Sequence, residues 1–379
     1  MNIILDTNAF IYFFKICKGI EVPSKWNKKQ FDKTKYIECL ANCDKIIITS
    51  ETLHELFLQS LRQDDNLNLF IEQYMMIDDI NKGRFKIFKE MNKAKDGHLK
   101  VFNDKDIMYF DSDYLVRGVN NGRLNINKFL QAKVEGEKTY IRKFIKVLMV
   151  SVFGVFHKIN GDKVIEEIYE QYLNVCDEYI EQKLSIIYKK CYIERSIDNK
   201  TFENELDILL KQVFEMIFEC LNMQNYLLDD DKVFYEEIKS KEYLGVKYLL
   251  NVFNKLSSTN KVKCKDIFMQ ELKSAIDFIM DKMDENNMCI IEFNFIQYIL
   301  EKYISDKRAL KKNDIIDCLI ISCLDTNVDL IIDGDVDIEK DNIPSQEDTC
   351  VITFDKMLFN FSKQYQWMYN EAVYNEFFI

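Results

Sequence analysis

The 379-residue chain contains only two prolines and ten glycines. Because these residues supply many of the turns of sandwiches and barrels, their scarcity argues against an all-β fold and favours long helices. Only three histidines are present, and the eleven cysteines include no CxxC pair, so the sequence offers no zinc site of the usual spacing. We expect the cysteines to be reduced thiols that act as small apolar residues.

The sequence also lacks a long apolar run. The longest one, residues 147–156 if Ser151 and Gly154 are allowed, is too short to cross a bilayer. The first residues carry no basic segment and place Asp6 inside an apolar stretch, which argues against a secretory signal. We therefore expect a soluble, cytoplasmic protein with no membrane partner. The formal net charge of −12 argues against a broad phosphate-binding surface but leaves room for a local one.

Strand and helix patterns alternate at both ends of the chain. Short apolar segments typical of buried strands occupy residues 3–5, 45–49, 329–332 and 350–354. Helical patterns occupy residues 9–17, 50–61 and 313–324, and a final helix begins near Lys356. This alternation predicts an α/β fold with a mostly parallel sheet flanked by helices.

The middle of the chain has a different pattern. Apolar residues recur there at three- and four-residue spacing, which is typical of amphipathic helices, in residues 162–184, 203–221 and 265–283. Residues 82–136 carry most of the loop signals. Because the chain exceeds a typical single domain, we predict a discontinuous α/β domain formed by residues 1–60 and 305–379. A large all-α insertion, residues 61–304, separates its halves.

Five carboxylates lie where a parallel sheet would bring them to one edge. Asp6 follows the first strand, Glu55 lies in the first turns of the helix after the second strand, and Asp355 follows the last strand. Asp314 and Asp317 lie on the late helix. Like charges about 4 Å apart repel by roughly 4 kcal/mol at an effective dielectric near 20, and divalent cations relieve such repulsion. Oxygen donors alone favour Mg²⁺ or Mn²⁺ over zinc.

Asp317 carries the strongest local argument for a site. At 100° per residue it shares a helix face with Ile320, Ile321 and Leu324, so an ionised carboxylate interrupts an apolar stripe. A buried carboxylate without a partner shifts its pKa or destabilises the fold. A metal ion or a hydrogen-bonding network is therefore expected beside it.

The other acids have simpler structural explanations when each is taken alone. Asp6 and Asp355 each precede a helix, so both are candidate N-caps. Glu55 shares its helix face with Glu51 and other polar residues, which is typical of a solvated position. His54 points about 100° away from Glu55 around the helix, and we interpret it as structural rather than catalytic.

Four segments, in this order, resemble the sequence signatures of PIN-domain nucleases. They are "IILDTNAFI", "IIITSETLHELF", "NDIIDCLIIS" and "VITFDKML". The resemblance implies a parallel α/β sheet with an acidic pocket that binds Mg²⁺ or Mn²⁺ and cleaves single-stranded or structured RNA. Flap-nuclease relatives of that family cut DNA instead. Family members usually place only a few short helices between the second and third acids, so the long insertion departs from the family pattern.

Carried over residue by residue, the resemblance implies both catalytic and metal-binding positions. The catalytic acids are Asp6, Glu55, Asp317 and Asp355, and Asp314 is a helper ligand to the metal. Asn8 and Thr353 are supporting polar residues next to the first and fourth acids. Because a further apolar strand precedes the "CVITF" segment, Asp333 and Asp335 remain alternatives to Asp355 as the fourth acid.

The expected chemistry is metal-assisted hydrolysis of an RNA phosphodiester by an endoribonuclease. A metal held by the acids lowers the pKa of a bound water, and a second ion stabilises the leaving oxygen. Lysines next to the acids are candidates for the substrate backbone, namely Lys311, Lys312 and Lys356. The segment "KTYIRKFIK", residues 138–146, is either a grip on a single strand or an ordinary amphipathic helix.

Two alternatives stay open on the sequence alone. One is a catalytically silent PIN-like scaffold that binds or regulates, and the other is a flap-type DNA nuclease. The helical insertion is interpreted as a lid, a sensor or a platform for a protein partner.

Overall fold

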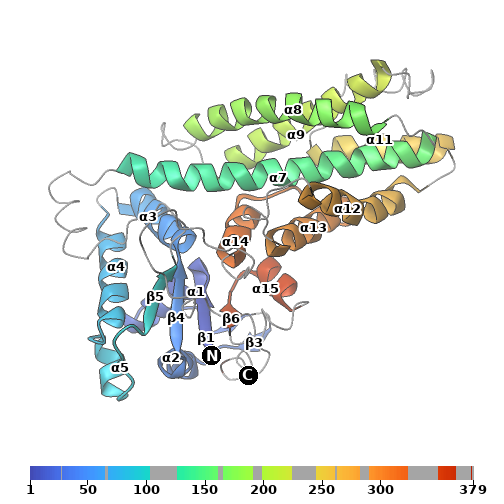
Figure 1. Ribbon diagram of the computed structural model, residues 1–379. Coiled ribbons are helices and arrows are strands. Elements are labelled where there is room, and N and C mark those ends of the chain that lie inside the picture. Colours follow the sequence, from blue (N-terminus) through green and yellow to red (C-terminus); the bar gives the residue numbers. More distant parts are fainter. Residues whose placement is uncertain are drawn as a thin grey trace. The chain divides into compact units, whose positions relative to one another are not determined.

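The computed structural model describes most of the chain. The described residues are 1–26, 28–64, 67–102, 126–160, 165–190, 199–223, 245–260, 263–281, 290–322, 349–363 and 377. The chain divides into two compact units (Figure 1). The sheet unit comprises Met1–Lys133 and Ile316–Ile379, and the helical unit comprises Val134–Ile315. Among the described residues, none of the helices is long and apolar enough to cross a membrane.

The sheet unit is built on four parallel strands in the order β5-β4-β1-β6. The strands are β1 (Asn2–Leu5), β4 (Lys45–Thr49), β5 (Leu99–Phe102) and β6 (Thr349–Ile352). Because β6 comes from the far end of the sequence and pairs with β1, the two ends of the chain meet in one sheet. The structure is thus a mostly helical α/β chain with a small parallel sheet, which is the class that the sequence predicts.

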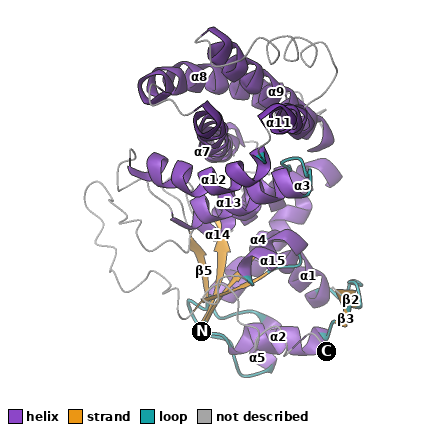
Figure 2. Cartoon of the chain, turned by 90° about the vertical axis from the view of Figure 1, so that its right-hand side faces the viewer, coloured by secondary structure: helices purple, strands orange, loops and turns teal. Residues whose placement is uncertain are grey.

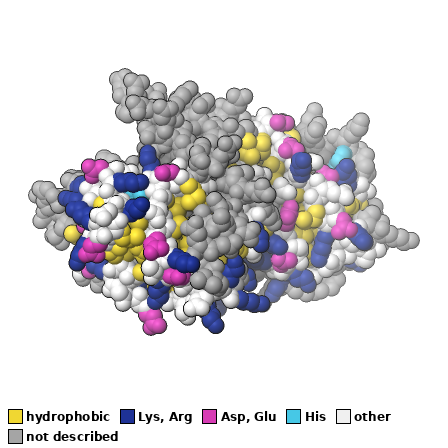
Figure 3. All heavy atoms as spheres, turned by 90° about the horizontal axis from the view of Figure 1, so that it is seen from below, with side chains coloured by type: hydrophobic (Ala, Val, Ile, Leu, Met, Phe, Trp, Pro, Cys, Tyr) yellow, Lys and Arg dark blue, Asp and Glu magenta, His cyan; other side chains and the backbone are white. Residues whose placement is uncertain are grey.

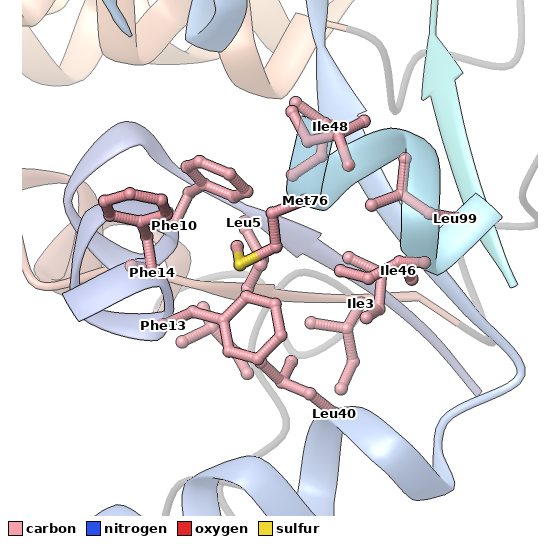
Figure 4. Close-up of a cluster of buried hydrophobic side chains, with 14 of the residues drawn as sticks. Ile3, Leu5, Phe10, Phe13, Phe14, Leu40, Ile46, Ile48, Met76 and Leu99 are labelled. Atoms are coloured by element: carbon pink, nitrogen blue, oxygen red, sulfur yellow. The ribbon is translucent and has the colours of Figure 1, made fainter. Parts of the chain in front are cut away.

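The central strand β1 is buried on both faces, which explains its continuous apolar run. Figure 4 shows the core on one of these faces, where strand side chains meet those of α1 (Thr7–Cys17), α2 (Lys33–Asn42) and α4 (Asn68–Asn81). The labelled members of this core are Ile3, Leu5, Phe10, Phe13, Phe14, Leu40, Ile46, Ile48, Met76 and Leu99.

The remaining described elements of the sheet unit are short except for one helix. They are α3 (Ser50–Asp64), α5 (Lys86–Glu90), α15 (Lys356–Ser362) and an antiparallel hairpin of β2 (Lys25–Trp26) and β3 (Lys29–Gln30). The edge strand β5 lies in the region that the sequence marks as rich in loop signals. Because α4, α5 and β5 belong to the sheet unit, that unit reaches residue 133 rather than residue 60. The second border falls at residue 316 rather than 305.

The helical unit contains long amphipathic helices, as the spacing of apolar residues predicts (Figure 2). The helices are α7 (Ile126–Asn160), α8 (Ile165–Tyr188), α9 (Asn199–Met223), α11 (Gly245–Asn260), α12 (Cys264–Asp281), α13 (Ile290–Ser305) and α14 (Lys312–Ser322). Helix α9 packs against α8 and α11, and α12 packs against α11 and α13. The first residues of α7 and the last residues of α14 belong to the sheet unit.

The basic and aromatic segment at residues 138–146 is an ordinary part of α7. Tyr140 and Phe144 are fully buried. The guanidinium of Arg142 donates to both carboxylate oxygens of Asp177 on α8, at 2.9 and 2.6 Å. The other cations of the segment also have acidic partners, namely Lys138, Lys143 and Lys146. Because the aromatic rings and the cations are used inside the helical unit, the amphipathic-helix interpretation fits this segment and the single-strand grip does not.

The described cysteines behave as small apolar residues. All eight of them are free thiols, and seven are buried. Burial raises the pKa of the Cys43 thiol to about 12. A thiol held in its neutral form is a poor nucleophile and a poor metal ligand, so this cysteine has a packing role.

Candidate functional site

The strand register brings three polar residues side by side at the carboxyl edge of the sheet. Leu5 at the end of β1 pairs with Ile48 of β4 on one side and with Ile352 of β6 on the other. The next residues along the three strands therefore lie next to one another, and they are Asp6, Thr49 and Thr353. The carboxyl edge is where open α/β sheets place their ligands.

Asp6 lies at the centre of this edge and is only 2% exposed. Its Oδ1 accepts a hydrogen bond from the backbone N–H of Ala9 at 2.6 Å, which caps α1. Its Oδ2 accepts a hydrogen bond from the hydroxyl of Thr353. The helix-cap interpretation and the site interpretation are thus compatible, because one carboxylate performs both roles. The two bonds fix its orientation.

The surroundings of Asp6 make its ionised form costly. Its pKa is raised from 3.8 to about 7, mainly by burial. The hydrogen bonds from Thr353 and Ala9 oppose this shift, and the negative charges of Asp355 and Glu55 add to it. Acids from three separate segments therefore repel one another at this edge. A bound cation would relieve that repulsion.

Thr353 links Asp6 to Asp355. Its Oγ1 donates to Asp6 and accepts a hydrogen bond from the backbone N–H of Asp355 at 2.8 Å. Asp355 is also an N-cap, since its Oδ1 accepts from the N–H groups of Met357 at 2.6 Å and Leu358 at 3.1 Å at the start of α15. The cap uses Oδ1 alone, and the side chain is partly exposed. Its Oδ2 is therefore a candidate ligand.

Glu55 reaches the same edge from α3. The hydroxyl of Thr52 donates to the carbonyl of Leu5 at 3.4 Å, and it lies 3.2 Å from the hydroxyl of Thr49. These contacts hold the first turn of α3 against the end of β1, one turn before Glu55. The sequence alone allowed a solvated face of α3 around Glu55. That face is not solvated, because Thr52 is fully buried and Glu51 is 8% exposed. The sequence analysis did not single out Thr49, although threonines at a strand–helix junction are a usable signal.

Asp314 and Asp317 lie on the same helix but have different surroundings. Asp314 accepts from two nitrogens of the Arg308 guanidinium, at 2.7 and 2.5 Å, and from the backbone N–H of Lys311 at 2.8 Å. This ion pair occupies both carboxylate oxygens of Asp314 and gives it a structural role, while the helper-ligand role expected from the resemblance stays a prediction. Asp317 is 7% exposed and belongs to the sheet unit.

The lysines expected to bind substrate also differ from one another. The backbone N–H of Lys312 donates to Glu203 at 3.3 Å, and its ammonium lies 5.5 Å from the centre of the Phe202 ring. Lys312 is therefore packed inside the helical unit and is not a surface cation. Lys311 and Lys356 are exposed, and Lys356 directly follows the capping residue of α15.

Three further residues expected at the site are Asn8, Asp333 and Asp335. Asn8 is exposed in the first turn of α1, two positions after Asp6. Asp333 and Asp335, together with the strand expected at residues 329–332, lie outside the described residues. The choice between them and Asp355 as a fourth acid stays a prediction, and so does the ligand role of Asp317.

Two tyrosines outside the four motifs also lie near Asp6. Burial raises the pKa of both phenols, and the charge of Asp6 raises each further. The hydroxyl of Tyr36 donates to the carbonyl of Ala9 at 3.0 Å, so Tyr36 holds the start of α1 in place. Tyr12 is partly exposed, and its ring centre lies 4.4 Å from that of Phe354. The sequence analysis singled out neither ring, because Tyr12 lies within the helical pattern of residues 9–17 and Tyr36 lies outside the predicted elements.

The negative charges of Glu55 and Asp355 act on Asp6, and all three side chains offer carboxylate oxygens as ligands. Such donors suit a hard divalent cation. Within the described part of the chain, no three His, Cys, Asp or Glu side chains are grouped closely enough to hold a metal ion by themselves. Comparisons of the chain with protein-family models, curated proteins and solved structures find no match.

Proposed function

We propose that this protein is a metal-dependent phosphodiester hydrolase, an endoribonuclease of PIN-domain type with a large helical insertion. One observation carries the proposal. Asp6 is buried at the end of the central parallel strand, is oriented by two hydrogen bonds, and is surrounded by the negative charges of Asp355 and Glu55. Helix capping explains Asp6 and Asp355 one at a time, but it does not explain why the charge of Glu55 also acts on Asp6. Phosphodiester hydrolysis with Mg²⁺ or Mn²⁺ uses several carboxylates together.

The donor set fits a magnesium-like ion that keeps part of its hydration shell. Mg²⁺ is commonly bound through one or two carboxylates, several waters and the phosphates of the substrate, without a complete protein cage. In this proposal Asp6 and the Oδ2 of Asp355 bind the ion, with Glu55 and Asp317 as further carboxylates around it. When bound, the ion lowers the pKa of a water and neutralises charge on the phosphate.

The protein's own groups orient the carboxylates and the substrate. Thr353 holds Oδ2 of Asp6 and the backbone of Asp355 in one hydrogen-bonded unit, so the two acids keep a fixed relation. Thr52 ties the helix that carries Glu55 to the end of β1. Lys356 lies exposed beside Asp355 and is the favoured contact for a substrate phosphate. No histidine is required as a general base.

The deciding experiment compares cleavage by the wild-type protein and Asp6→Asn. A panel of single-stranded RNA, structured RNA and branched DNA is incubated with Mn²⁺ or with a chelator. We expect the wild type to cut RNA with Mn²⁺ only, and Asp6→Asn to be inactive while still folded, because asparagine caps a helix nearly as well as aspartate. Asp317→Asn is expected to be inactive as well.

The chain offers a matched control for this substitution. Asp32 caps α2 in the same way, accepting from the N–H groups of Thr34 and Lys35, at 3.0 and 3.1 Å. We therefore expect Asp32→Asn to keep both activity and metal response. Unchanged cleavage by Asp6→Asn, or equal losses in both variants, would remove the basis for the proposed site.

Thermal unfolding with Mn²⁺ separates the remaining alternatives. An ion at 100 times its Kd stabilises the folded state by about 2.7 kcal/mol. We expect this stabilisation in the wild type and in Asp32→Asn, and its loss in Asp6→Asn. A protein that binds RNA without any Mn²⁺ response is a scaffold, and one that responds to Mn²⁺ but cuts only branched DNA is a flap-type nuclease.

A further inference from the structure

The β2–β3 hairpin is a concentration of positive charge in an acidic protein. The segment from Val22 to Phe31 has three lysines and no acid, between exposed Glu21 and partly exposed Asp32, whereas the whole chain has a formal charge of −12. All three lysines are exposed, namely Lys25, Lys28 and Lys29. On the face seen in the space-filling view, Lys and Arg side chains are interspersed with Asp and Glu (Figure 3). A segment of ten residues with three lysines and no acid therefore differs from that mixed pattern.

The hairpin is fixed beside the carboxylate edge. The indole Nε1 of Trp26 donates to the carbonyl of Phe354 at 2.9 Å, and Phe354 is the residue between Thr353 and Asp355. The Trp26 ring also meets the rings of Phe354 and Phe359 edge-on, with centres 5.8 and 4.8 Å apart. A partly buried hydrogen bond and two ring contacts hold a short hairpin that would be marginal alone. The lysines thus have a fixed position relative to Asp355.

Lys28 occupies a backbone conformation that favours glycine. Its φ is +70°, in the left-handed region, at the turn between the two strands. Hairpin turns of this length commonly use glycine, asparagine or aspartate at such positions, because a side chain there costs energy. A strained residue is a reason to look for a function. A lysine at the tip of an exposed hairpin presents its ammonium to a partner rather than to the protein core.

The neighbourhood identifies the partner as a polyanion that reaches the carboxylate edge. Lysines beside an indole suit phosphates. An acidic peptide and a phosphodiester meet the same repulsion from Asp355 and Glu55, and the proposed hydrolysis at this edge favours the phosphodiester as the occupant. Exposed Lys356 extends the positive charge from the hairpin side to the first turn of α15.

We infer that the β2–β3 hairpin is a nucleic-acid binding arm that holds the phosphate backbone of a single strand through Lys25, Lys28 and Lys29. The choice of occupant rests on the proposed function, because the arm lies next to the proposed site of phosphodiester hydrolysis. The arm places a strand across β6, with one end at the hairpin and the reacting phosphate at Asp6.

The test measures binding of a labelled single-stranded RNA in the presence of a chelator, where no cleavage occurs. The triple variant Lys25→Gln/Lys28→Gln/Lys29→Gln is compared with the wild type over a range of salt concentrations. Each lost phosphate contact reduces the slope of log K against log salt by about 0.7, so three lost contacts reduce it by about 2. We expect that reduction, together with a Kd at least about tenfold weaker at low salt.

A control triple in the same unit has the same change of charge. Lys86, Lys89 and Lys93 are exposed on and just after α5, away from the hairpin contacts described above. We expect Lys86→Gln/Lys89→Gln/Lys93→Gln to bind RNA like the wild type. Equal weakening in both triples would show a nonspecific effect of net charge and would overturn the inference, and so would wild-type binding by the hairpin triple.

Further readouts separate this inference from the proposed function. The hairpin triple is expected to keep the Mn²⁺ stabilisation of the wild type, because it leaves the carboxylates intact. Wild-type protein that binds RNA through the hairpin without cutting it would refute the nuclease proposal and keep the arm. If the hairpin triple loses polyglutamate binding but keeps RNA binding, the partner of the arm is an acidic protein and not a nucleic acid.

A single substitution guards against loss of folding. Lys28→Gly removes one ammonium and relieves the left-handed strain, so its melting temperature is expected to equal or exceed that of the wild type while RNA binding weakens. Weaker binding by a variant that is at least as stable cannot be ascribed to misfolding. Unchanged binding by Lys28→Gly would exclude the tip of the hairpin from the interface.

Discussion

Thr353 donates its hydroxyl hydrogen to Oδ2 of Asp6, and this bond joins two residues 347 positions apart in the sequence. It forms because β6 pairs in parallel with β1 and Ile352 lies opposite Leu5. The polar edge of the sheet is therefore complete only when the two ends of the chain have come together. A substitution at either end is expected to affect the same carboxylate.

The first prediction concerns Thr353→Val. Thr353 is almost fully buried and holds both Asp6 and the backbone N–H of Asp355. Valine keeps the shape but leaves an acceptor and a donor without this partner, which costs about 1–3 kcal/mol of unfolding free energy. Because the Thr353 hydrogen bond lowers the pKa of Asp6, the same change is expected to raise that pKa further. Urea unfolding and a carboxyl NMR titration measure the two effects.

Thr353→Ser is the matched control, since serine keeps the hydroxyl. We expect it to retain the Asp6 pKa and most of the stability. If valine and serine have the same effect on the Asp6 pKa, the hydroxyl does not orient this carboxylate and Thr353 acts through packing alone.

The second prediction concerns the dependence of stability on pH without metal. The pKa of Asp6 is raised from 3.8 to about 7, so the folded protein binds this proton more tightly than the unfolded chain. The stability contributed by neutral Asp6 is fully present below pH 3.8 and is lost as pH rises through about 7. At most one proton is involved, so the unfolding free energy falls by up to about 1.4 kcal/mol per pH unit within that window.

Asp6→Asn isolates this contribution because asparagine does not titrate. We expect the chelated variant to lose less stability than the wild type between about pH 4 and pH 7. The measurement is urea unfolding of both proteins across that range. Parallel stability curves would mean that Asp6 titrates alike in the folded and unfolded chains.

The sheet was largely predictable because its signal is local. Buried strands such as "NIIL" and "KIIIT" are short apolar runs followed directly by polar residues, and their parallel pairing follows from alternation with helices. That pattern is sufficient to place Asp6 and Asp355 at one edge. Strand β5 was missed because its four residues stand among loop signals, and its place depends on pairing with β4.

The roles of individual polar residues were less predictable, because they depend on partners distant in sequence or on the path of a loop. Asp314 lies in the "NDIIDCLIIS" segment and resembles a metal ligand there. A turn at Lys307, with φ of +55°, instead places the Arg308 guanidinium on its carboxylate. Lys312 stands in a basic run and nevertheless packs on α9. No helical periodicity reports such contacts.

The third prediction uses Asp314 to separate structure from metal binding. Asp314 is almost fully buried and Arg308 mostly so, and removing one partner of a buried ion pair costs about 3–5 kcal/mol. We expect Asp314→Asn to lower the melting temperature markedly while leaving the Mn²⁺ stabilisation of the remaining folded protein unchanged. The double variant Arg308→Met/Asp314→Leu is expected to recover much of the lost stability, because both charges are then absent. A selective loss of Mn²⁺ stabilisation in Asp314→Asn would identify Asp314 as a metal ligand.

The fourth prediction compares two glutamates one turn apart on α3. The charge of Glu55 acts on Asp6, whereas Oε1 of Glu51 lies 3.7 Å from Nδ1 of buried His54. We expect Glu55→Gln to reduce cleavage and Mn²⁺ affinity at least about tenfold, as the loss of groups in and around a metal site does. It should also lower the pKa of Asp6, because one like charge is removed. Glu51→Gln is expected to change melting temperature more than metal response. If Glu51→Gln abolishes the Mn²⁺ response and Glu55→Gln does not, the acid on this helix has been assigned to the wrong turn, and the metal lies one turn nearer the start of α3 on the same helix face.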